Sequence, residues 1–435
     1  MPGKRIVFCT FGSLGDLHPI VALAREMKHR GHSPLIATSP IYRSRVEADG
    51  LGFHAVRPDV DVTDPAILRR VMDRRNGARY IFEKMLLPSL RESYEDTLAA
   101  VRDADLIVTH PVTLGALLVA RKGAIPWASV ALSPVSMFSV YDPPVFTGIP
   151  FAEQLAKLGP PFQRTFLKTM ALLFEPIWKP FRTFERELGL SPIPNPLLFP
   201  PPSRLIMGLF SPLLGPPQRD WPAHAHATGF PFLRQDESNS QDLQDFLDAG
   251  DAPIVFTLGS AAVGAAGDFF QQSAEAAHAL GRRAILLVGR DPRNRGPLAL
   301  PPGVIAVPYA PHSAVFPHGC VNVHQGGIGT TGEAMRAGRP MLVVHYSHDQ
   351  PDHAARLTRL GVARGVPRER YNTKVAVREI KALLEDKSYS ERAAVIGAQV
   401  RNEDGTSRAC DLLDRLLEAP HQDVTNSVLA GQAVA

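Results

Sequence analysis

Short apolar runs and amphipathic stretches alternate along the first 130 residues of the chain. The run at residues 5–10 (RIVFCT) predicts a buried strand. Behind it, Ile20, Leu23 and Met27 recur at helical spacing, and the helix they predict ends before Gly31. Strands that alternate with helices in this way form parallel sheets covered on both faces. The pattern therefore predicts an α/β fold.

The same alternation resumes after about residue 232, so the chain contains two regions of one architecture. A stretch rich in proline and aromatic residues, 134–217, separates them, and such an insertion is typical of a segment that lines a pocket. We expect an amino-terminal domain at residues 1–217, a carboxy-terminal domain at 218–418 and a flexible tail at 419–435.

Composition narrows the class of protein. The 435 residues are enough for two domains of ~100 to 200 residues each. With 47 basic and 43 acidic residues the net charge is +4, which does not indicate a nucleic-acid partner. No apolar run reaches the ~20 residues of a membrane-spanning helix, and the first residues lack a secretory cleavage pattern. Three cysteines form no disulfide framework, which predicts a cytoplasmic protein.

A glycine-rich segment at residues 323–331 (VHQGGIGTT) joins a predicted strand to a predicted helix. Small residues let a phosphate approach the backbone, where the N–H groups and the dipole of the helix stabilise its charge. His324 can donate one further hydrogen bond to such an anion. The alternative is a tight turn in which glycine only supplies positive φ. The pattern is neither a dinucleotide fingerprint nor a P-loop, so it does not predict NAD binding or ATP hydrolysis.

Polar residues beyond this segment are further candidates. Thr330 and Glu333 have the T-x-x-E spacing of a helix capping box, although Glu333 can equally accept a ribose hydroxyl. In the segment 345–353 (HYSHDQPDH), Asp349 and Gln350 can grip sugar hydroxyls, and Asp349 can also cap the helix that follows. The histidines and carboxylates here lie on a strand, a loop and a helix start and face different ways, which argues against a metal site.

The amino-terminal counterpart is the segment 11–19 (FGSLGDLHP), also between a predicted strand and a predicted helix. A carboxylate here can take a proton from an acceptor hydroxyl, which makes Asp16 a candidate general base. The alternative is structural: Asp16 or His18 caps a helix that has Pro19 at its first position.

These motifs, in this order and over nearly the whole chain, resemble the family 1 glycosyltransferases, the UDP-glycosyltransferase superfamily. Within it the nearest likeness is to the bacterial rhamnosyltransferase of rhamnolipid synthesis and to sterol glucosyltransferases. The resemblance implies a GT-B fold, in which two Rossmann-like domains face each other across a cleft. The motifs that carry it are GSLGDLHP at 12–19, DWP at 220–222, TGFP at 228–231, FTLGS at 256–260, YAPH at 309–312, HQGGIGTT at 324–331 and HDQ at 348–350.

The resemblance also implies roles for the matching residues. Tyr309 matches the aromatic residue that stacks on the base, and His324 matches the side-chain donor to the diphosphate. Asp16 occupies the position of the catalytic histidine of plant members, which favours Asp16 over His18 as the base. Plant members place a ribose-binding glutamate where this chain has Gly332, one position before Glu333. The implied catalytic residues are Asp16 and His18; the implied donor-binding residues are Gly12, Ser13, Ser260, Tyr309, Ala310, His312, His324, Gly326, Gly327, Gly329, Thr330, Glu333, Asp349 and Gln350.

The predicted reaction is an inverting, metal-independent transfer of a hexose, first of all glucose from UDP-glucose, to a hydroxyl of a hydrophobic small molecule. The expected acceptor is a phenol, a sterol or a lipid, and no cofactor is expected besides the donor. A dTDP-rhamnose-dependent transfer to a hydroxy-fatty acceptor is the alternative within the family. A nucleotide-sugar epimerase or hydrolase, or a binder without catalysis, is the alternative from another class.

The segment 134–217 is expected to bind the acceptor through its aromatic side chains, and some of these serve the core instead. The same segment can also rest on a membrane surface, which predicts a peripheral enzyme as an alternative. The aromatic candidates are Phe138, Tyr141, Phe146, Phe151, Phe166 and Trp178.

Overall fold

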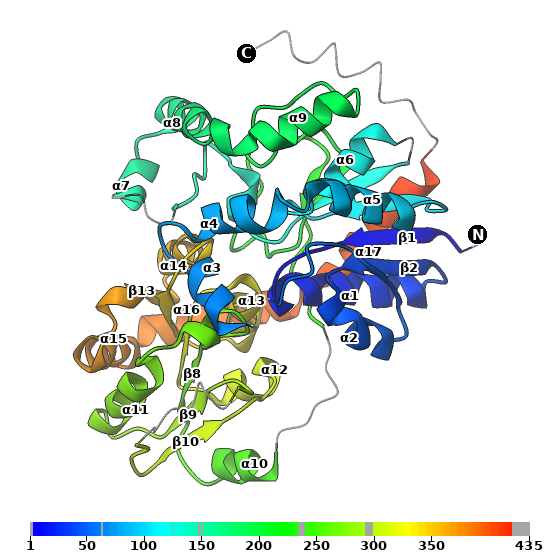
Figure 1. The fold of residues 1–435 in the computed structure, drawn as a ribbon. Helices are drawn as coiled ribbons and strands as arrows, with labels where there is room; N and C mark the ends of the chain where they lie inside the picture. The colour runs from blue at the N-terminus through cyan, green and yellow to red at the C-terminus, as the bar shows by residue number, and fades with distance from the viewer. Residues whose placement is uncertain are drawn as a thin grey trace.

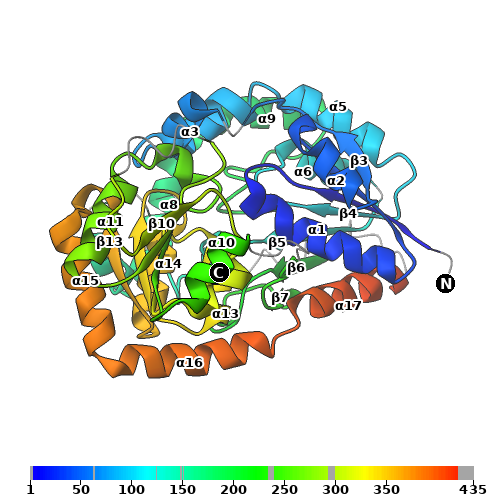
Figure 2. The ribbon, with the colours of Figure 1, turned by 90° about the horizontal axis from the view of Figure 1, so that it is seen from below.

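The computed structural model describes residues 3–61, 64–123, 125–146, 149, 151–233, 240–291 and 299–419. Two parallel sheets organise these residues, and helices cover both (Figure 1 and Figure 2). This architecture confirms the predicted α/β fold with two Rossmann-like regions. The tail predicted at 419–435 lies outside the described residues except for Ala419.

The sheet of the amino-terminal half has the strand order β3-β2-β1-β4-β5-β6-β7, and that of the carboxy-terminal half has the order β10-β9-β8-β11-β12-β13. In both, the strand order reverses beside the first strand, where the loops at the carboxyl ends are the usual ligand sites. The first sheet contains β1 (Arg5–Cys9), β2 (Ser33–Thr38), β3 (Gly52–Ala55), β4 (Leu106–Thr109), β5 (Trp127–Ala131), β6 (Leu205–Gly208) and β7 (Ala225–Ala227). The second contains β8 (Ile254–Thr257), β9 (Ala284–Leu287), β10 (Val304–Val307), β11 (Val321–His324), β12 (Met341–His345) and β13 (Ala363–Pro367).

Helices connect the strands in both halves. The described helices of the amino-terminal half are α1 (Leu14–His29), α2 (Arg43–Ala48), α3 (Pro65–Val71), α4 (Gly77–Tyr80), α5 (Leu90–Ala100), α6 (Leu114–Lys122), α7 (Ala152–Ala156), α8 (Pro160–Leu173) and α9 (Lys179–Glu187). Those that follow are α10 (Gln241–Asp248), α11 (Phe269–Ala279), α12 (His312–Val315), α13 (Ile328–Ala337), α14 (Gln350–Arg359), α15 (Thr373–Glu385), α16 (Lys387–Arg401) and α17 (Gly405–Glu418).

Alternate residues of the central strand β1 pack against helices on opposite faces of the sheet. Ile6 and Phe8 join a cluster with buried residues of α1 and α17. Val7 and Cys9 join another cluster, with buried residues of α5, α6 and α9. Successive side chains of a strand point to opposite faces, so a strand with helices on both faces must be apolar throughout. This requirement explains why the run at residues 5–10 is recognisable in the sequence.

The last helix returns to the amino-terminal half. Leu413 and Cys410 of α17 are 0% exposed and pack with the core around α1, while α16 spans the distance between the two sheets (Figure 2). The strand β7 likewise pairs with β6. The sheet of the amino-terminal half therefore extends beyond residue 217, and its core includes a helix from the range expected for the second domain.

The proline-rich segment between β5 and β6 is largely helical. It contains the short 3-10 turn η3 (Pro134–Met137) and the helices α7, α8 and α9, and these three helices lie in the upper part of the molecule in Figure 1. The side chains of Trp178 and Phe181 are almost fully buried with α5 and α6. Part of the segment therefore serves the core of the amino-terminal half.

Candidate active site

Asp16 lies in the first turn of α1, directly after β1. The helix begins at Leu14 with Ser13 as its N-cap, so Pro19 lies inside the helix and is not its first residue. Asp16 Oδ2 accepts hydrogen bonds from Ser13 N at 2.8 Å and Ser13 Oγ at 3.1 Å. Ser13 and Asp16 thus form a reciprocal capping box, and the other carboxylate oxygen of Asp16, Oδ1, is not needed for it.

The loop before Asp16 brings the backbone close to the carboxylate. Gly12 has φ +133°, and a Cβ on this residue would lie 2.3 Å from Asp16 Oδ2, so only glycine fits. Tyr42 donates a hydrogen bond from its hydroxyl to the carbonyl of Gly12 at 2.7 Å. These contacts fix the predicted pair Gly12 and Ser13 around the carboxylate of Asp16.

The carboxylate of Asp16 has the electrostatics of a base that works near neutral pH. Burial raises its pKa to about 6, although hydrogen bonds from Ser13 act in the opposite direction. The side chain is still 31% exposed, so a substrate hydroxyl can reach it. The negative charge of Asp349, from the carboxy-terminal half, also raises the pKa of Asp16. The two acidic residues therefore lie within electrostatic range of each other.

His110 is a neighbour of Asp16 that the sequence motifs did not indicate. It follows β4, and its Nε2 lies 3.8 Å from Asp16 Oδ1. Burial lowers the pKa of His110 to about 4, so the ring is neutral at physiological pH. Its Nδ1 is buried and has no hydrogen-bond partner among the described residues. No local signal marks this histidine, because only the adjacency of β1 and β4 in the sheet brings it to Asp16.

His18 is less suited than Asp16 to act as the base. Burial lowers its pKa to about 4, and the nearby charge of Arg45 acts in the same direction. Its Nε2 is buried without a described partner. The structure thus keeps His18 neutral on the same helix as Asp16.

His324 ends β11 and is 0% exposed. Its Nδ1 accepts a hydrogen bond from the N–H of Gly326 at 3.1 Å, which places the ring proton on Nε2. Nε2 has no hydrogen-bond partner among the described residues, and burial lowers the pKa of His324 to about 3. The side chain is therefore a neutral donor whose N–H is unused, at the turn where the sequence predicts an anion.

The glycine turn leads into the uncapped start of α13. The helix begins at Ile328 with Gly327 as N-cap, and no side chain caps it. Gly326 has φ +89°, while a Cβ on Gly329 would have nothing within 4 Å. Gly326 thus serves the turn itself, whereas Gly329 leaves open space beside N–H groups that no side chain satisfies.

Glu333 is not part of a capping box, because the helix starts before Thr330. This finding overturns the structural alternative for the pair. The carboxyl of Glu333 lies in the second turn of α13, 3.7 Å from Arg336, and burial raises its pKa to about 7. A hydrogen-bonding role toward a ligand is the alternative that remains.

Asp349 and Gln350 lie at the start of α14 and differ in their contacts. Asp349 occupies the N-cap position, but its side chain makes no capping hydrogen bond and is 27% exposed. Gln350 is buried, and its Oε1 accepts hydrogen bonds from Tyr346 N at 2.8 Å and Ser347 N at 3.3 Å. Asp349 Oδ2 lies 3.7 Å from His353 Nε2 but makes no capping hydrogen bond, so the carboxylate can still contact a ligand. Gln350 shapes the preceding loop through its carbonyl oxygen.

The remaining predicted donor residues lie on neighbouring loops of the same half. Tyr309 follows β10, is 40% exposed and has the guanidinium of Arg290 4.4 Å from its ring centroid. Ala310 is buried, and His312 stacks on Phe316 with ring centroids 4.5 Å apart. Ser260 is exposed after β8. All these loops lie at the carboxyl ends of parallel strands, where ligands bind in open α/β sheets.

Several buried polar atoms around these loops have no described hydrogen-bond partner. They include Oε1 of Gln325, whose Nε2 lies 3.4 Å from Thr330 Oγ1, and Oγ1 of Thr331. Buried polar groups are normally satisfied, so unsatisfied atoms on both sides of this glycine turn fit a site for a polar ligand. The described residues include no group of three His, Cys, Asp or Glu side chains that could hold a metal ion.

A recess in the amino-terminal half adjoins the loop that carries Asp16. It has about 390 Å³ of empty space, including parts open to solvent. Its walls include Thr10, Phe11, Arg57, Thr113 and Leu114. These residues come from loops near Gly12 and His110, not from the segment 134–217.

Known proteins resemble both halves of the chain. The glycosyltransferase family 28 N-terminal domain matches residues 6–112, and the erythromycin biosynthesis protein CIII-like C-terminal domain matches residues 284–409. O-mycaminosyltylonolide 6-deoxyallosyltransferase of Streptomyces fradiae is 32% identical to this chain, over 95% of the chain and 98% of that protein. The chain belongs to the family 1 glycosyltransferases. It is therefore a sugar-transferring enzyme that uses a nucleotide-sugar donor.

This glycosyltransferase is also similar to longer proteins. Sterol 3-beta-glucosyltransferase of Aspergillus clavatus is 28% identical over 95% of the chain, and the chain spans 30% of the length of that relative.

Solved structures of similar length share the fold. The glycotransferase of kitacinnamycin has a TM-score of 0.73 at 21% identity, covering 96% of this chain and 100% of that one. The calicheamicin glycosyltransferase CalG4 has a TM-score of 0.69 at 18% identity, covering 96% and 99%. These likenesses confirm the predicted GT-B fold.

Proposed function

We propose that this glycosyltransferase catalyses an inverting, metal-independent transfer of a hexosyl group from UDP-glucose to a hydroxyl of a hydrophobic small molecule. One observation carries the proposal: the carboxylate of Asp16 has a raised pKa and lies within electrostatic range of Asp349. Asp349 belongs to the carboxy-terminal half, whose glycine turn holds the N–H of His324 that has no described partner. The proposed base for the acceptor hydroxyl thus lies in one half of the enzyme, and the hydrogen-bond donors for the leaving diphosphate lie in the other.

In the proposed reaction the acceptor oxygen attacks the anomeric carbon while its proton passes to the Asp16 carboxylate. The new carbon–oxygen bond forms as the bond between that carbon and the diphosphate oxygen breaks, and the diphosphate leaves with the electron pair. A base with a pKa near 6 is ionised at neutral pH and still accepts a proton as the bond forms. Attack from the side opposite the leaving group inverts the anomeric configuration.

Charge on the departing diphosphate is stabilised by donors that the fold has already oriented. His324 offers a neutral N–H from a fully buried ring, and the uncapped N–H groups at the start of α13 offer more. Preorganised donors of this kind stabilise developing charge strongly, which is the role a divalent cation has in other transferases. We therefore assign the stabilisation to the chain itself.

Turnover and nucleotide binding test this proposal separately. Asp16→Asn should lower kcat by about 10² to 10⁴ and leave the Kd for UDP nearly unchanged, because only the base is lost. His324→Ala should weaken UDP binding and lower kcat. Asp103→Asn, exposed before β4, and His278→Ala, exposed on α11, are matched controls that should behave as the wild type. Near-normal turnover of both site variants would contradict the proposal.

The relatives favour a second candidate donor. The Streptomyces fradiae relative is by name a 6-deoxyallosyltransferase, and its 32% identity extends over 95% of this chain. A dTDP-linked 6-deoxyhexose would therefore keep the chemistry and change the sugar. Release of UDP or TDP, measured with each donor in the presence and absence of a phenolic, sterol or hydroxy-fatty acceptor, distinguishes the candidates. Release without any acceptor would instead indicate a hydrolase.

A row of aromatic rings supports a hydrophobic acceptor. Phe138, Phe146, Phe166 and Phe162 follow one another with centroid distances of 6.3, 6.1 and 6.1 Å. These rings are only partly buried, unlike Trp178, which serves the core. Aromatic side chains supply most of the contact area in sites for apolar ligands. We propose that this row receives the acceptor.

The neighbouring surface supports peripheral binding to an anionic membrane. Among the described residues, Phe151, Leu158, Leu172, Leu173 and Phe174 are large apolar side chains exposed around α7 and α8. The sequence between residues 151 and 182 carries five basic residues against two acidic ones, Glu153 and Glu175. Apolar side chains among basic ones fit the interface of a bilayer that contains anionic lipids. No described helix is both long enough and apolar enough to span a membrane.

Flotation with liposomes tests the membrane proposal. The enzyme should float with vesicles that contain phosphatidylglycerol and much less with neutral phosphatidylcholine vesicles. Leu172→Ser combined with Leu173→Ser should abolish flotation without lowering turnover of a soluble acceptor. Absence of the wild type from the lipid fraction would exclude membrane binding by this surface.

We also propose that the enzyme is cytoplasmic. Its three cysteines are free, which fits a reducing compartment.

A further inference from the structure

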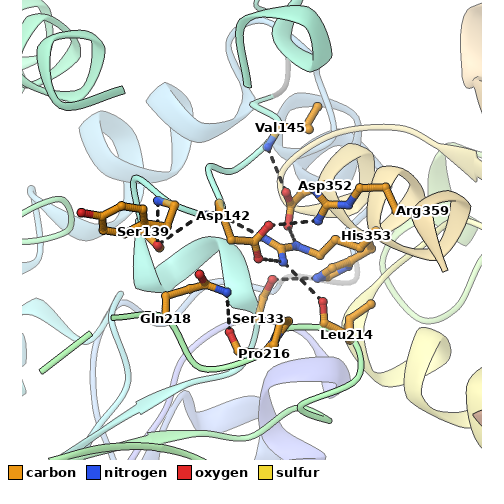
Figure 3. Close-up of polar contacts among 12 residues, drawn as sticks. Ser133, Ser139, Asp142, Val145, Leu214, Pro216, Gln218, Asp352, His353 and Arg359 are labelled. Carbon is orange, nitrogen blue, oxygen red and sulfur yellow. Dashed lines mark hydrogen bonds and ion pairs between the residues drawn. The ribbon is translucent and has the colours of Figure 1, made fainter. Parts of the chain in front are cut away.

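The helix α14 contacts both halves of the enzyme. It begins beside Asp349, a residue predicted to bind the hydroxyls of the donor sugar. One turn further, Asp352 is 1% exposed and its Oδ1 accepts a hydrogen bond from Val145 N at 2.9 Å (Figure 3). Arg356 is also buried and forms ion pairs with Asp352 and with Asp142. The segment 142–145 belongs to the amino-terminal half, called the acceptor half below because it is expected to bind the acceptor. This segment is thus anchored on α14, the helix that begins beside Asp349.

His353 lies between these contacts and is 0% exposed. Its Nδ1 is 2.7 Å from the carbonyl oxygen of Gly326 in the glycine turn. Its Nε2 is 2.7 Å from Ser133 Oγ, on the loop after β5 in the acceptor half, and Figure 3 shows these two side chains pointing toward each other. A carbonyl oxygen only accepts, so Nδ1 carries a proton and donates it to Gly326. The Ser133 hydroxyl is the hydrogen-bond partner of Nε2 and does not cap η3, and Asp349 Oδ2 lies 3.7 Å from the same nitrogen.

Two histidines therefore hold Gly326 from both sides. Its N–H donates to His324 at 3.1 Å, and its C=O accepts from His353. A Cβ on Gly326 would lie 2.8 Å from Val343 Cγ1, so packing also restricts this backbone. In a trans peptide the C=O and the next N–H point in opposite directions. The N–H of Gly327 therefore faces away from His353 and α14.

We propose that His353 is a positioning residue for the donor diphosphate. It holds the Gly326–Gly327 peptide so that the N–H of Gly327 meets the diphosphate, and through Ser133 it ties this orientation to the acceptor half. The inference rests on the proposed function, in which the glycine turn binds that diphosphate. A histidine that served packing alone would change stability without changing which part of the nucleotide is recognised.

Calorimetric titration with the uridine and thymidine series, each as nucleoside, monophosphate and diphosphate, tests this role. His353→Ala should weaken binding of the diphosphate about ten-fold, as expected for one misplaced donor to a charged group, and leave nucleoside binding unchanged. The amide nitrogen of His353→Asn reaches the position of Nδ1, so this variant should restore diphosphate binding. The amide of His353→Gln reaches the position of Nε2 instead and should not restore it.

Ser133→Ala tests the connection to the acceptor half. It should raise the KM for the donor about three-fold and leave kcat nearly unchanged, since one neutral hydrogen bond is lost. Ser136→Ala is the matched control: Ser136 is a half-buried serine of the adjoining turn η3, and no described hydrogen bond joins its side chain to α14. The control should behave as the wild type.

The outcomes separate this inference from the proposed function. If the wild type binds UDP or TDP and His353→Ala binds it equally well, or loses the nucleoside to the same extent, His353 has no positioning role. Equal diphosphate affinities of His353→Asn and His353→Gln would also exclude that role, even if the alanine variant does not fold. If the wild type binds neither diphosphate, the proposed function itself is wrong.

Discussion

Asp16 combines an observed structural role and a proposed catalytic role in one carboxylate. Oδ2 completes the capping box of α1 with Ser13, while Oδ1 faces His110 at 3.8 Å. Burial raises the pKa of the group to about 6, which means that ionisation is less favourable in the folded enzyme than in an unfolded chain. The same desolvation that makes the carboxylate a better base therefore lowers the stability of the fold at neutral pH.

The pH dependence of turnover should report this carboxylate. The base must be ionised, so kcat/KM should rise with pH up to a plateau, with the midpoint near the pKa of about 6. A pH profile of kcat/KM, measured with a subsaturating acceptor whose charge does not change, reports it. A midpoint near 4, the ordinary value of an aspartate, would show that the buried environment does not tune this base.

Asp16→Asn should lose turnover without losing stability. The pKa is raised in the folded state, so wild-type stability decreases as pH rises from the unfolded pKa of ~3.9 through about 6, and the neutral amide escapes this loss. Asparagine can still accept the hydrogen bond from Ser13 N. Thermal unfolding at pH 8 should give a Tm at or above that of the wild type. A clearly lower Tm would mean that the charge itself stabilises the loop.

His110→Ala should move the acid limb of the pH profile to lower pH. Burial is the largest cause of the raised pKa of Asp16, and the ring of His110 lies 3.8 Å from its carboxylate, so loss of the ring should admit water, lower the pKa of Asp16 and raise turnover at pH 6 relative to pH 8. The measurement is the same pH profile, with nucleotide binding as the control. An unchanged midpoint would show that the 3.8 Å approach carries no coupling.

At the scale of elements, different glycines from the end of β11 to the first turn of α13 have different structural roles. Gly326 adopts positive φ and packs against Val343, whereas Gly329 lies in the helix and borders open space. A substitution at each position therefore tests a different property, the stability of the turn or the room for a ligand.

Gly326→Ala should lower the stability of the enzyme, whereas Gly329→Ala should lower its affinity for UDP. Gly326→Ala should destabilise the enzyme by about 1–3 kcal/mol, because alanine is strained at φ +89°. Gly329→Ala should keep or raise the Tm but weaken UDP binding by about ten-fold, because its methyl group occupies the space proposed for the diphosphate. Thermal unfolding and calorimetry measure the two effects. Unaltered UDP affinity of Gly329→Ala would place the diphosphate elsewhere.

At the scale of the whole molecule, the end of the described chain belongs to the first half. Arg30, the C-cap residue of α1, pairs with Asp411 and Asp414 of α17 at 2.7 and 2.8 Å, and Leu413 of α17 is buried. The helix α14 also joins the halves, because its residues Arg356 and Arg359 pair with Asp142 of the first half. Besides the chain that links them, the two halves are therefore connected by the contacts of α17 with α1 and of α14 with the first half.

Leu413→Ala should destabilise the amino-terminal half although it lies in the carboxy-terminal part of the sequence. Loss of a fully buried leucine typically costs about 2–5 kcal/mol. Hydrogen exchange should therefore increase in β1 and α1 before it increases in β8 and β11. Arg415→Ala, exposed on the same helix, is the control. Faster exchange confined to the second sheet would contradict this packing.

Local patterns were sufficient to predict the architecture and much of the site. Strands covered on both faces must be apolar, and a turn that needs positive φ requires glycine, so β1 and Gly326 carry their signals in the residues themselves. The start of α1 was harder, because Pro19 suggested a helix start that the capping box of Ser13 and Asp16 places five residues earlier, at Leu14. Cap geometry depends on which side chain reaches which N–H, and spacing alone does not specify it.

Short stretches of sequence already specify the two parallel sheets, the glycine turn and the acidic loop, because each follows from the period and composition of neighbouring residues. Three-dimensional packing was needed to show that His110 adjoins Asp16, that His353 bridges Gly326 and Ser133, and that α17 packs against α1. These contacts join residues far apart along the chain, and the folding of both sheets brings them together. The pKa values of the site belong to this second group, since desolvation depends on everything packed around a group and not on its neighbours in sequence.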